Sequence, residues 1–275
     1  MQTQADLKNT LDSLASPTKA IALARFFKTG KGEYGEGNRF LGITVPEQRK
    51  LAKAFVSLSF EDIEQLLQTD IHEYRLTALL ILTYQFPKAD PVRQEEIVAF
   101  YLNHTKWINN WDLVDVTCRQ ILGVYLLNRD RSILYQLAQS LSLWEQRIAI
   151  VSTLEFIKHE QFEDTLKIVI ALLDHRHDLI HKAVGWMLRE VGKQDRQVLV
   201  EFLDIYHQQM PRTMLRYAIE HFEEPTRKGY LRKSPQKSGN RSSPSGYRVG
   251  AGLVDNSVLK QDLYAKPAPT LETSP

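Results

Sequence analysis

The stretch YRLTALLILTYQF, from Tyr74 to Phe86, carries the pattern that decides the fold. Its leucines at Leu76, Leu79 and Leu80 follow the three- and four-residue spacing of one face of an α-helix. Pro87 comes directly after the stretch and is expected to end the helix, because proline cannot donate the next backbone hydrogen bond. The pattern indicates a helix that packs into an apolar core.

The same spacing recurs through residues 6–225, with little alternation of β-branched residues and no Asn-Gly hairpin signal. Core helices are expected at 110–126, 143–157, 179–191 and 212–222, with Gly192 as the stop signal of the third. Amphipathic partner helices are expected at 91–102, 131–139, 161–173 and 195–208. The fold class is therefore predicted to be all-α.

The helix pairs repeat along the chain with a period near 35 residues. Equivalent positions in successive pairs are Arg75, Asp112, Arg147, Lys182 and Arg216. They lie 37, 35, 35 and 34 residues apart in the sequence. Two helices in each such period are typical of an α-solenoid, in which equivalent positions form a row along one surface. Because four of these five positions are basic, a cationic row is predicted, with Arg119, Arg189 and Arg212 adding to it.

The charge balance shows where a polyanion could bind. Residues 226–275 hold nine Lys and Arg against three Asp and Glu, which leaves 26 basic and 30 acidic residues in 1–225. The body is thus not generally basic, and only a segregated basic face could bind a phosphate backbone. Duplex DNA is the regular polyanion that suits such a row, and an acidic protein partner is the rival interpretation. Rich in Ser, Pro, Gly and basic residues, 226–275 is expected to be a disordered tail.

Composition narrows the class of protein further. The 275 residues are 43% hydrophobic and 25% charged, as in ordinary globular proteins. The single cysteine, Cys118, excludes intramolecular disulfides and cysteine-based zinc clusters, which fits a reducing cytoplasm. Neither a signal peptide nor a membrane span is expected, because no apolar segment approaches about 18 residues. His175 and His177 suit a polar surface loop better than a metal site, so no metal is expected.

The stretch WINNWDLVD, from Trp107 to Asp115, holds the first candidate site. On a helix, Trp111 and Asp115 share one face. A core would not accept an unpaired carboxylate, and a solvated face has little use for an indole, whereas the two together suit a bound cation. Trp186 is a second candidate, because a glycine inside a helix, here Gly185, marks a close approach to the backbone. The alternative for Trp186 is a core indole.

Several separated motifs resemble one family. They are FLGITVPEQRK at 40–50, WDLVD at 111–115, LWEQRIAI at 143–150, HKAVGWMLRE at 181–190 and RTMLRYAIE at 212–220. Together they are similar to the AlkD-type DNA glycosylases, a HEAT-like-repeat family of alkylpurine repair enzymes, in collinear order from about residue 10 to 225. The resemblance implies a superhelical solenoid of HEAT-like repeats in residues 1–225, with a concave surface that holds DNA.

The resemblance also implies roles for individual residues. Asp115 matches the catalytic carboxylate, Trp111 and Trp186 match the two tryptophans of the catalytic cleft, and Arg147 matches the cleft arginine. The segment Tyr34–Arg39 departs from the family pattern, which leaves lesion preference open. With the cationic row, the predicted DNA-binding residues are Arg147, Arg75, Lys182, Arg189, Arg212 and Arg216.

The implied activity is hydrolysis of the N-glycosidic bond of cationic N3- or N7-alkylated purines in duplex DNA, without full base flipping. The product is an abasic site in base excision repair. A monofunctional, monomeric enzyme is expected, without metal or cofactor, in the cytoplasm and at the nucleoid in a bacterium. Two alternatives stay open: a non-catalytic HEAT-repeat protein that binds damaged or branched DNA, and a protein-interaction scaffold.

Overall fold

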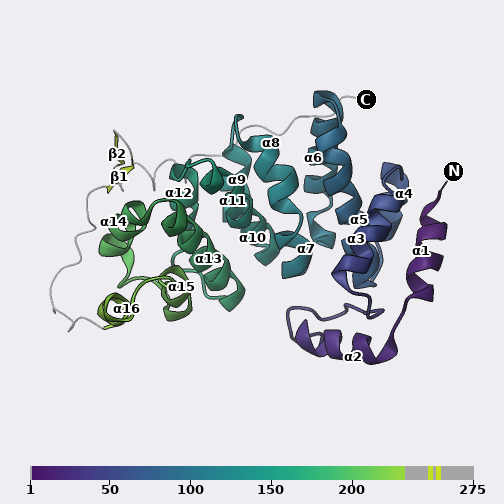
Figure 1. Cartoon of the computed structure of the whole chain (residues 1–275), viewed down its shortest axis with the longest axis horizontal. Coiled ribbons are helices and arrows are strands. Elements are labelled where there is room, and N and C mark those ends of the chain that lie inside the picture. Colours follow the sequence, from purple (N-terminus) through teal and green to yellow (C-terminus); the bar gives the residue numbers. More distant parts are fainter. Residues whose placement is uncertain (1, 233–246, 250–251, 255–275) are drawn as a thin grey trace. The chain divides into compact units, whose positions relative to one another are not determined.

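The computed structural model describes residues 2–232, 247–249 and 252–254 (Figure 1). Helices make up almost all regular structure in these residues, which confirms the all-α class. The described strands are the short antiparallel pair β1 (Tyr247–Val249) and β2 (Gly252–Val254). The chain divides into two compact units, residues 1–159 and 160–275. In the described ranges, every helix is too short or too polar to cross a membrane.

The first unit is built from short helices, most of them joined by short connections; the longest connection is residues 27–44, between α2 and α3. Its α-helices are α1 (Gln4–Ser13), α2 (Pro17–Phe26), α3 (Val45–Ala54), α4 (Phe60–Leu67), α5 (His72–Gln85), α6 (Pro91–Asn103), α7 (Trp111–Asp115), α8 (Val124–Leu126), α9 (Ser132–Gln139), α10 (Leu143–Ser152) and α11 (Leu154–Lys158). Two 3-10 turns, η1 (Phe86–Lys88) and η2 (Thr105–Trp107), and a π-helical turn, η3 (Arg119–Gly123), complete it. Side chains of Asp90, Asn110 and Ser142 cap α6, α7 and α10.

Helix α5 is the centre of the first unit. Every residue from His72 to Thr83 is buried, so this helix has no solvent face. A helix that is apolar nearly all round must be covered on all sides, and α5 packs against α3 and α4. Burial of each leucine contributes about 1.5–3 kcal/mol to stability. The buried polar residues of α5, among them His72, Glu73 and Arg75, therefore need partners in neighbouring elements.

Neighbouring inner helices in the first unit run parallel. Contacts between the α3 and α5 regions pair Gln48 with Thr77 and Leu58 with Gln85, so both chains advance in the same direction. From η2 to η3, contacts with α10 and α11 advance in the same way, through Thr105 with Glu145, Asp115 with Arg147 and Arg119 with Glu155. Parallel stacking of equivalent helices is the arrangement expected of solenoid repeats.

Two predicted core helices are interrupted. Residues 110–126 form α7, a turn, the π-helical turn η3 and then α8, instead of one helix. In the turn, the Thr117 hydroxyl donates to the carbonyl of Leu113 at 2.5 Å. The Thr153 hydroxyl donates to the carbonyl of Ile150 at 2.7 Å where α10 gives way to α11. Such back-bonding bends helices, and it leaves Asp115 at the carboxyl end of a short helix.

The second unit contains α12 (Glu163–Ala171), α13 (Asp178–Gln194), α14 (Arg196–Tyr206), α15 (Arg212–Ala218) and α16 (Glu224–Leu231). The predicted close approach at Gly185 is confirmed, because a Cβ there would lie 2.5 Å from the Met214 carbonyl oxygen of α15. The predicted stop at Gly192 is wrong, since α13 continues to Gln194. Gly192 serves packing instead: a Cβ there would meet Leu199 of α14 at 2.3 Å.

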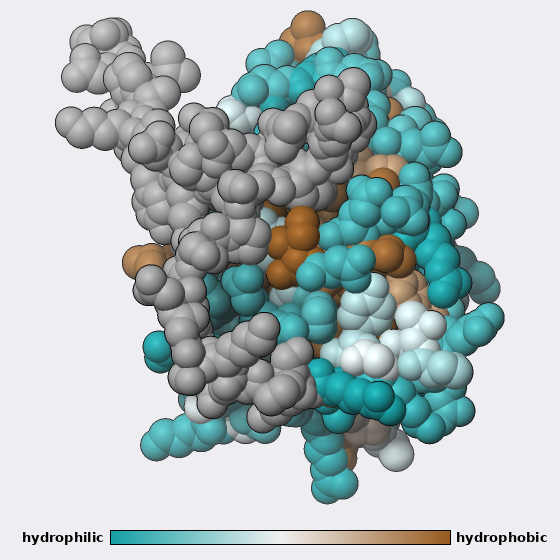
Figure 2. Space-filling view, turned by 90° about the vertical axis from the view of Figure 1, so that its left-hand side faces the viewer, coloured by the Kyte–Doolittle hydropathy of each residue, from teal (hydrophilic) through white to brown (hydrophobic). Residues whose placement is uncertain are grey.

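The expectation of a disordered tail from residue 226 needs correction at two places. Residues 226–231 belong to α16, where Tyr230 donates to Asp204 of α14 at 2.9 Å. Residues 247–249 and 252–254 form the β1–β2 pair. The remainder of the predicted tail lies outside the described residues. On the face seen in Figure 2 the described surface is mostly hydrophilic, with apolar side chains in small groups.

Candidate active site

Trp111 begins helix α7, and its indole is held on three sides. The Asn110 side chain accepts a hydrogen bond from the Trp111 backbone N–H at 2.8 Å and caps the helix. Phe27 stacks on the indole with centroids 5.1 Å apart, and Phe26 meets it edge-on at 5.8 Å. The indole Nε1–H donates to the Tyr34 hydroxyl at 3.3 Å. A half-buried indole in this setting has a restricted orientation.

Asp115 ends helix α7 and pairs with Arg147 of α10. Arg147 Nε donates to Oδ1 at 2.8 Å and Nη2 donates to Oδ2 at 2.7 Å. The Asp115 and Arg147 side chains are only 16% and 6% exposed, so this is an interior, two-pronged ion pair. Burial raises the pKa of the Asp115 carboxyl above its ordinary value, whereas the Arg147 guanidinium acts in the opposite direction. The pair fixes a carboxylate one helical turn from Trp111.

The structure corrects the solvent-facing position predicted for Arg147. The residue is buried, and its guanidinium donates two hydrogen bonds to Asp115. The two bonds hold the Asp115 carboxylate in one orientation. Each carboxylate oxygen has two lone pairs, so Asp115 keeps acceptor capacity for a further donor such as water.

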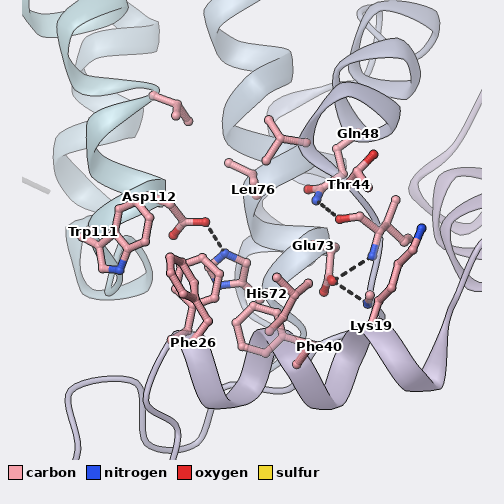
Figure 3. A pocket seen from close by; sticks show the side chains of 17 residues that line it. Lys19, Phe26, Phe40, Thr44, Gln48, His72, Glu73, Leu76, Trp111 and Asp112 are labelled. Carbon is pink, nitrogen blue, oxygen red and sulfur yellow. Dashed lines mark hydrogen bonds and ion pairs between the residues drawn. The ribbon is translucent and has the colours of Figure 1, made fainter.

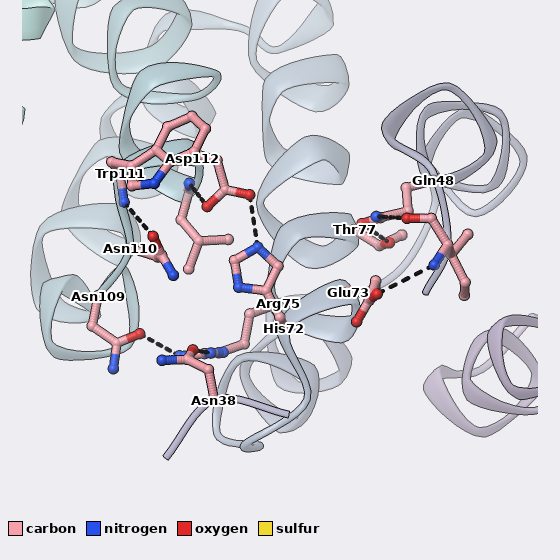
Figure 4. Close-up of polar contacts among 12 residues, drawn as sticks. Asn38, Gln48, His72, Glu73, Arg75, Thr77, Asn109, Asn110, Trp111 and Asp112 are labelled. Carbon is pink, nitrogen blue, oxygen red and sulfur yellow. Dashed lines mark hydrogen bonds and ion pairs between the residues drawn. The ribbon is translucent and has the colours of Figure 1, made fainter. Parts of the chain in front are cut away.

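The solvent-facing position predicted for Arg75 is also wrong. Its side chain is 2% exposed and donates to Asn38 and Asn109, and to the carbonyl of Trp107 at 3.5 Å (Figure 4). Burial lowers the pKa of Arg75 to about 10. Arg75 thus braces two loops from inside α5. Asp112, the third repeat-equivalent position in this unit, is buried as well. The row of equivalent positions therefore lies in the interior of the first unit and does not form a cationic surface.

Asp112 pairs with His72, a residue that the sequence reasoning missed. The His72 Nε2 and Asp112 Oδ2 atoms lie 2.7 Å apart and both side chains are largely buried (Figure 4). Phe40 stacks on the imidazole at a centroid distance of 4.6 Å, and Phe27 lies on it at 5.1 Å. No local sequence signal joins residues 40 positions apart, because only packing of α5 against α7 brings them together.

Glu73 fixes the segment that leads into α3. Its carboxylate accepts backbone N–H bonds from Leu41 at 2.9 Å, Gly42 at 2.8 Å and Ile43 at 3.3 Å. Gly42 has φ of +88°, and a Cβ there would lie 2.3 Å from the Ser16 carbonyl oxygen. Only glycine fits this crossing, which holds the start of α2 against the segment.

A cavity of about 480 Å³ lies between α2, the 40–45 segment, α5 and α7 (Figure 3). Trp111 and Phe26 lie at one side of it and Lys19 with Gln48 at the other in this view. No residue of α2 is fully buried, so this helix covers the cavity loosely. The lining is largely aromatic and aliphatic, with Phe26, Phe27, Phe40, Leu23, Leu76 and Trp111 among its members. The cavity thus adjoins the candidate site through Trp111.

The other predicted site residues belong to the second unit. Trp186 on α13 is half-buried and its Nε1–H donates to Glu190 at 3.1 Å. Lys182 pairs with Asp178 at 2.7 Å, and Arg189 pairs with Glu220 in the turn after α15. Arg212 and Arg216 are exposed on α15. Lys182, Trp186 and Arg189 share one face of α13 by their spacing. Catalytic and DNA-binding roles for these residues stay predictions.

A family model described as DNA alkylation repair enzyme matches residues 7–222. The chain therefore belongs to the DNA alkylation repair enzyme family, which confirms the family that the sequence motifs indicated. Two solved structures share its fold. A predicted DNA alkylation repair enzyme from Enterococcus faecalis is 19% identical with a TM-score of 0.60, covering 76% of this chain and 97% of that chain. AlkD2 from Streptococcus mutans is 15% identical with a TM-score of 0.51, covering 74% and 99%. No curated protein sequence matches the chain.

Proposed function

We propose that this member of the DNA alkylation repair enzyme family is a monofunctional DNA glycosylase. It hydrolyses the N-glycosidic bond of cationic N3- or N7-alkylated purines in duplex DNA and leaves an abasic site in base excision repair. The observation that carries the proposal is the pairing, on one short helix, of an oriented indole, Trp111, with a fixed carboxylate, Asp115.

The chemistry of a cationic base suits these groups. Alkylation at N3 or N7 makes the purine a good leaving group, so no general acid is needed to protonate it. As the bond breaks, positive charge moves to the deoxyribose in an oxocarbenium-like transition state. An indole face stabilises a cation by about 0.5–2 kcal/mol, depending on desolvation. Phe27 stacks on one face of the Trp111 indole, and the opposite face is the one that meets the cation in this proposal.

Asp115 supplies the electrostatic contribution. The Arg147 guanidinium holds its carboxylate in one orientation, so no reorganisation is needed when the cation develops. The remaining lone pairs can accept a hydrogen bond from the attacking water and orient it toward the sugar. Because catalysis requires no contacts to the base, the base stays largely within the duplex. Neutral lesions are poor substrates, because their bases are poorer leaving groups.

The remaining contacts in the proposal come from the second unit. Trp186 acts as a second indole next to the sugar, and Lys182, Arg189, Arg212 and Arg216 contact phosphates. The exposed positions of Arg212 and Arg216, one helical turn apart on α15, support this part of the proposal. The protein would act as a monomer on duplex DNA, in the cytoplasm and at the nucleoid in a bacterium, without metal or cofactor.

One observation favours a second candidate, a non-catalytic protein that binds damaged or branched DNA. Both Asp115 oxygens already accept bonds from Arg147, which is also what a purely structural ion pair would do. Duplexes that contain 7-methylguanine separate the two candidates, since only a glycosylase releases the base and forms abasic sites. A protein-interaction scaffold would show neither base release nor duplex affinity that falls steeply with salt.

The experiment compares base release by wild type, Trp111→Ala and Asp115→Asn. Glu155→Gln is the matched control, because Glu155 has the same 16% side-chain exposure as Asp115 and also pairs with an arginine of a neighbouring helical segment, Arg119. Release should fall in both site variants and persist in the control. No release by the wild type would refute the proposed activity.

A further inference from the structure

The segment from Lys28 to Arg39, between α2 and α3, directs one tyrosine toward the candidate site. The Tyr34 hydroxyl accepts the indole N–H of Trp111 at 3.3 Å. Its ring meets Trp144 edge-on, with centroids 6.1 Å apart and planes at 70°. Tyr34 therefore links an indole on α7 to an indole on α10. Both indoles are half-buried.

The segment has a shape of its own. Glu33 accepts the backbone N–H of Gly30 at 2.8 Å, and Glu36 accepts that of Gly32 at 2.8 Å. A Cβ at Gly35 would lie 2.3 Å from the Phe27 carbonyl oxygen, so the backbone crosses itself there at a distance only glycine permits. These local bonds and the close crossing define the path of the chain on both sides of Tyr34.

The segment is also anchored to the core. Asn38 donates to the Gly35 carbonyl at 2.8 Å and its side-chain oxygen accepts a bond from Arg75. The backbone of Arg39 bonds on both sides, donating to the Asp70 carbonyl at 2.9 Å and accepting from His72 at 2.8 Å. Buried Arg75 thus holds, through Asn38, the segment that carries Tyr34. Burial of a guanidinium costs desolvation free energy, and the hydrogen bonds that Arg75 donates offset part of that cost.

We propose that Tyr34 is a positioning residue for Trp111. It holds the indole so that the face not covered by Phe27 is presented to the sugar, and this orientation sets the rate of base release. The inference rests on the proposed glycosylase activity. A Trp χ2 torsion has broad, roughly two-fold minima, and a hydrogen bond at Nε1 selects one of them. Because the attraction between a cation and an indole requires the cation over the ring face, the selected orientation matters for catalysis.

The test uses the full-length chain and a duplex with one 7-methylguanine. Tyr34→Phe removes the hydroxyl and keeps the ring against Trp144. We expect single-turnover release to slow about 3- to 10-fold, the loss that corresponds to one hydrogen bond. Affinity for a duplex with a tetrahydrofuran abasic analogue should change less than about 2-fold, since no phosphate contact is lost. Asn38→Ala should slow release similarly through the loosened segment.

Tyr74→Phe is the control, because it also removes a tyrosine hydrogen bond in the first unit, the 2.5 Å bond to Asp12 of α1, away from Trp111. It should leave the release rate unchanged. The indole N–H NMR resonance of Trp111, assigned with a Trp111→Phe sample, should shift in Tyr34→Phe and not in Tyr74→Phe.

The outcomes distinguish the positioning role from the activity itself. If the wild type releases the base and Tyr34→Phe releases it at the same rate, the positioning role is overturned and the glycosylase proposal stays intact. If the wild type releases no base, the proposed activity fails, and the NMR comparison then decides whether Tyr34 holds the indole. An unshifted Trp111 resonance in Tyr34→Phe overturns that contact in either case.

Discussion

Replacement of Arg147 by methionine tests whether the ion pair prepares Asp115 for its task. Arg147→Met keeps an unbranched apolar side chain and removes both bonds to Asp115, at 2.8 and 2.7 Å. Asp115 then remains as an unpaired carboxylate that is only 16% exposed. Loss of one partner of a buried pair costs about 3–5 kcal/mol, because the other charge stays desolvated. Urea unfolding at neutral pH should show a loss of this size.

The same variant makes a pH prediction. Burial already raises the pKa of Asp115, and Arg147 is the main influence that lowers it, so Arg147→Met should raise the pKa further. A carboxyl with a higher pKa in the folded state binds more protons there than in the unfolded chain. Folding stability therefore falls as pH rises from about 3.8 through the folded-state pKa, and this fall should be larger in Arg147→Met. Base release needs the ionised form, so its acid limb should move to higher pH.

Arg119→Met is the matched control, since it breaks a single 3.2 Å contact with Glu155 in a more exposed pair. Its cost should be smaller than that of Arg147→Met, because one 3.2 Å contact is lost instead of two shorter bonds, and the acid limb of base release should not move. Two results together would refute this reasoning: an Arg147→Met variant no less stable than Arg119→Met, and an acid limb at the same pH as in the wild type. The Asp115–Arg147 pair would then not hold a buried charge.

Three further predictions concern packing, reactivity and DNA affinity. Gly185→Ala should destabilise the protein by about 1–3 kcal/mol in thermal or urea unfolding, because its Cβ would lie 2.5 Å from Met214 of α15. Gly229→Ala, with open space around the added Cβ, should be neutral or stabilising by up to about 1 kcal/mol, and equal costs would contradict the packing argument. Burial raises the pKa of Cys118 to about 12, so a thiol reagent near neutral pH should label it only after unfolding; rapid labelling of folded protein would contradict its burial. If Arg212 and Arg216 contact phosphates, each alanine variant should reduce the slope of log affinity against log salt by about one, and unchanged slopes would remove them from the DNA interface.

Local patterns in the sequence predicted much of the fold. The helices expected at 91–102 and 131–139 are found as α6 and α9 within one residue at each end. The four-residue spacing of Trp111 and Asp115 placed both on one helix, which is α7. The close backbone approach at Gly185 followed from the cost of a glycine inside a helix. These features depend on neighbours in the sequence, so periodicity and residue type are enough to find them.

Features that depend on distant partners were not predictable in this way. The repeat register aligned Arg75 with Arg147, but it could not say whether those side chains faced solvent or a neighbouring helix. In the first unit they face inward, because Asn38 and Asn109 provide acceptors for Arg75 and Asp115 provides them for Arg147. The approach of Tyr34 to Trp111 spans 77 positions and a glycine-rich segment, which no periodic signal describes.

The most direct test of the central claim is single-turnover release of 7-methylguanine from duplex DNA by Asp115→Asn, with DNA affinity measured on the same samples. Loss of the fixed carboxylate should slow release by about 100-fold or more, the usual effect of removing one preorganised transition-state contact. Affinity for the duplex should change little, and Glu155→Gln should match the wild type. Release by Asp115→Asn at the wild-type rate would contradict the claim that this carboxylate stabilises the positive charge that develops on the sugar as the base departs.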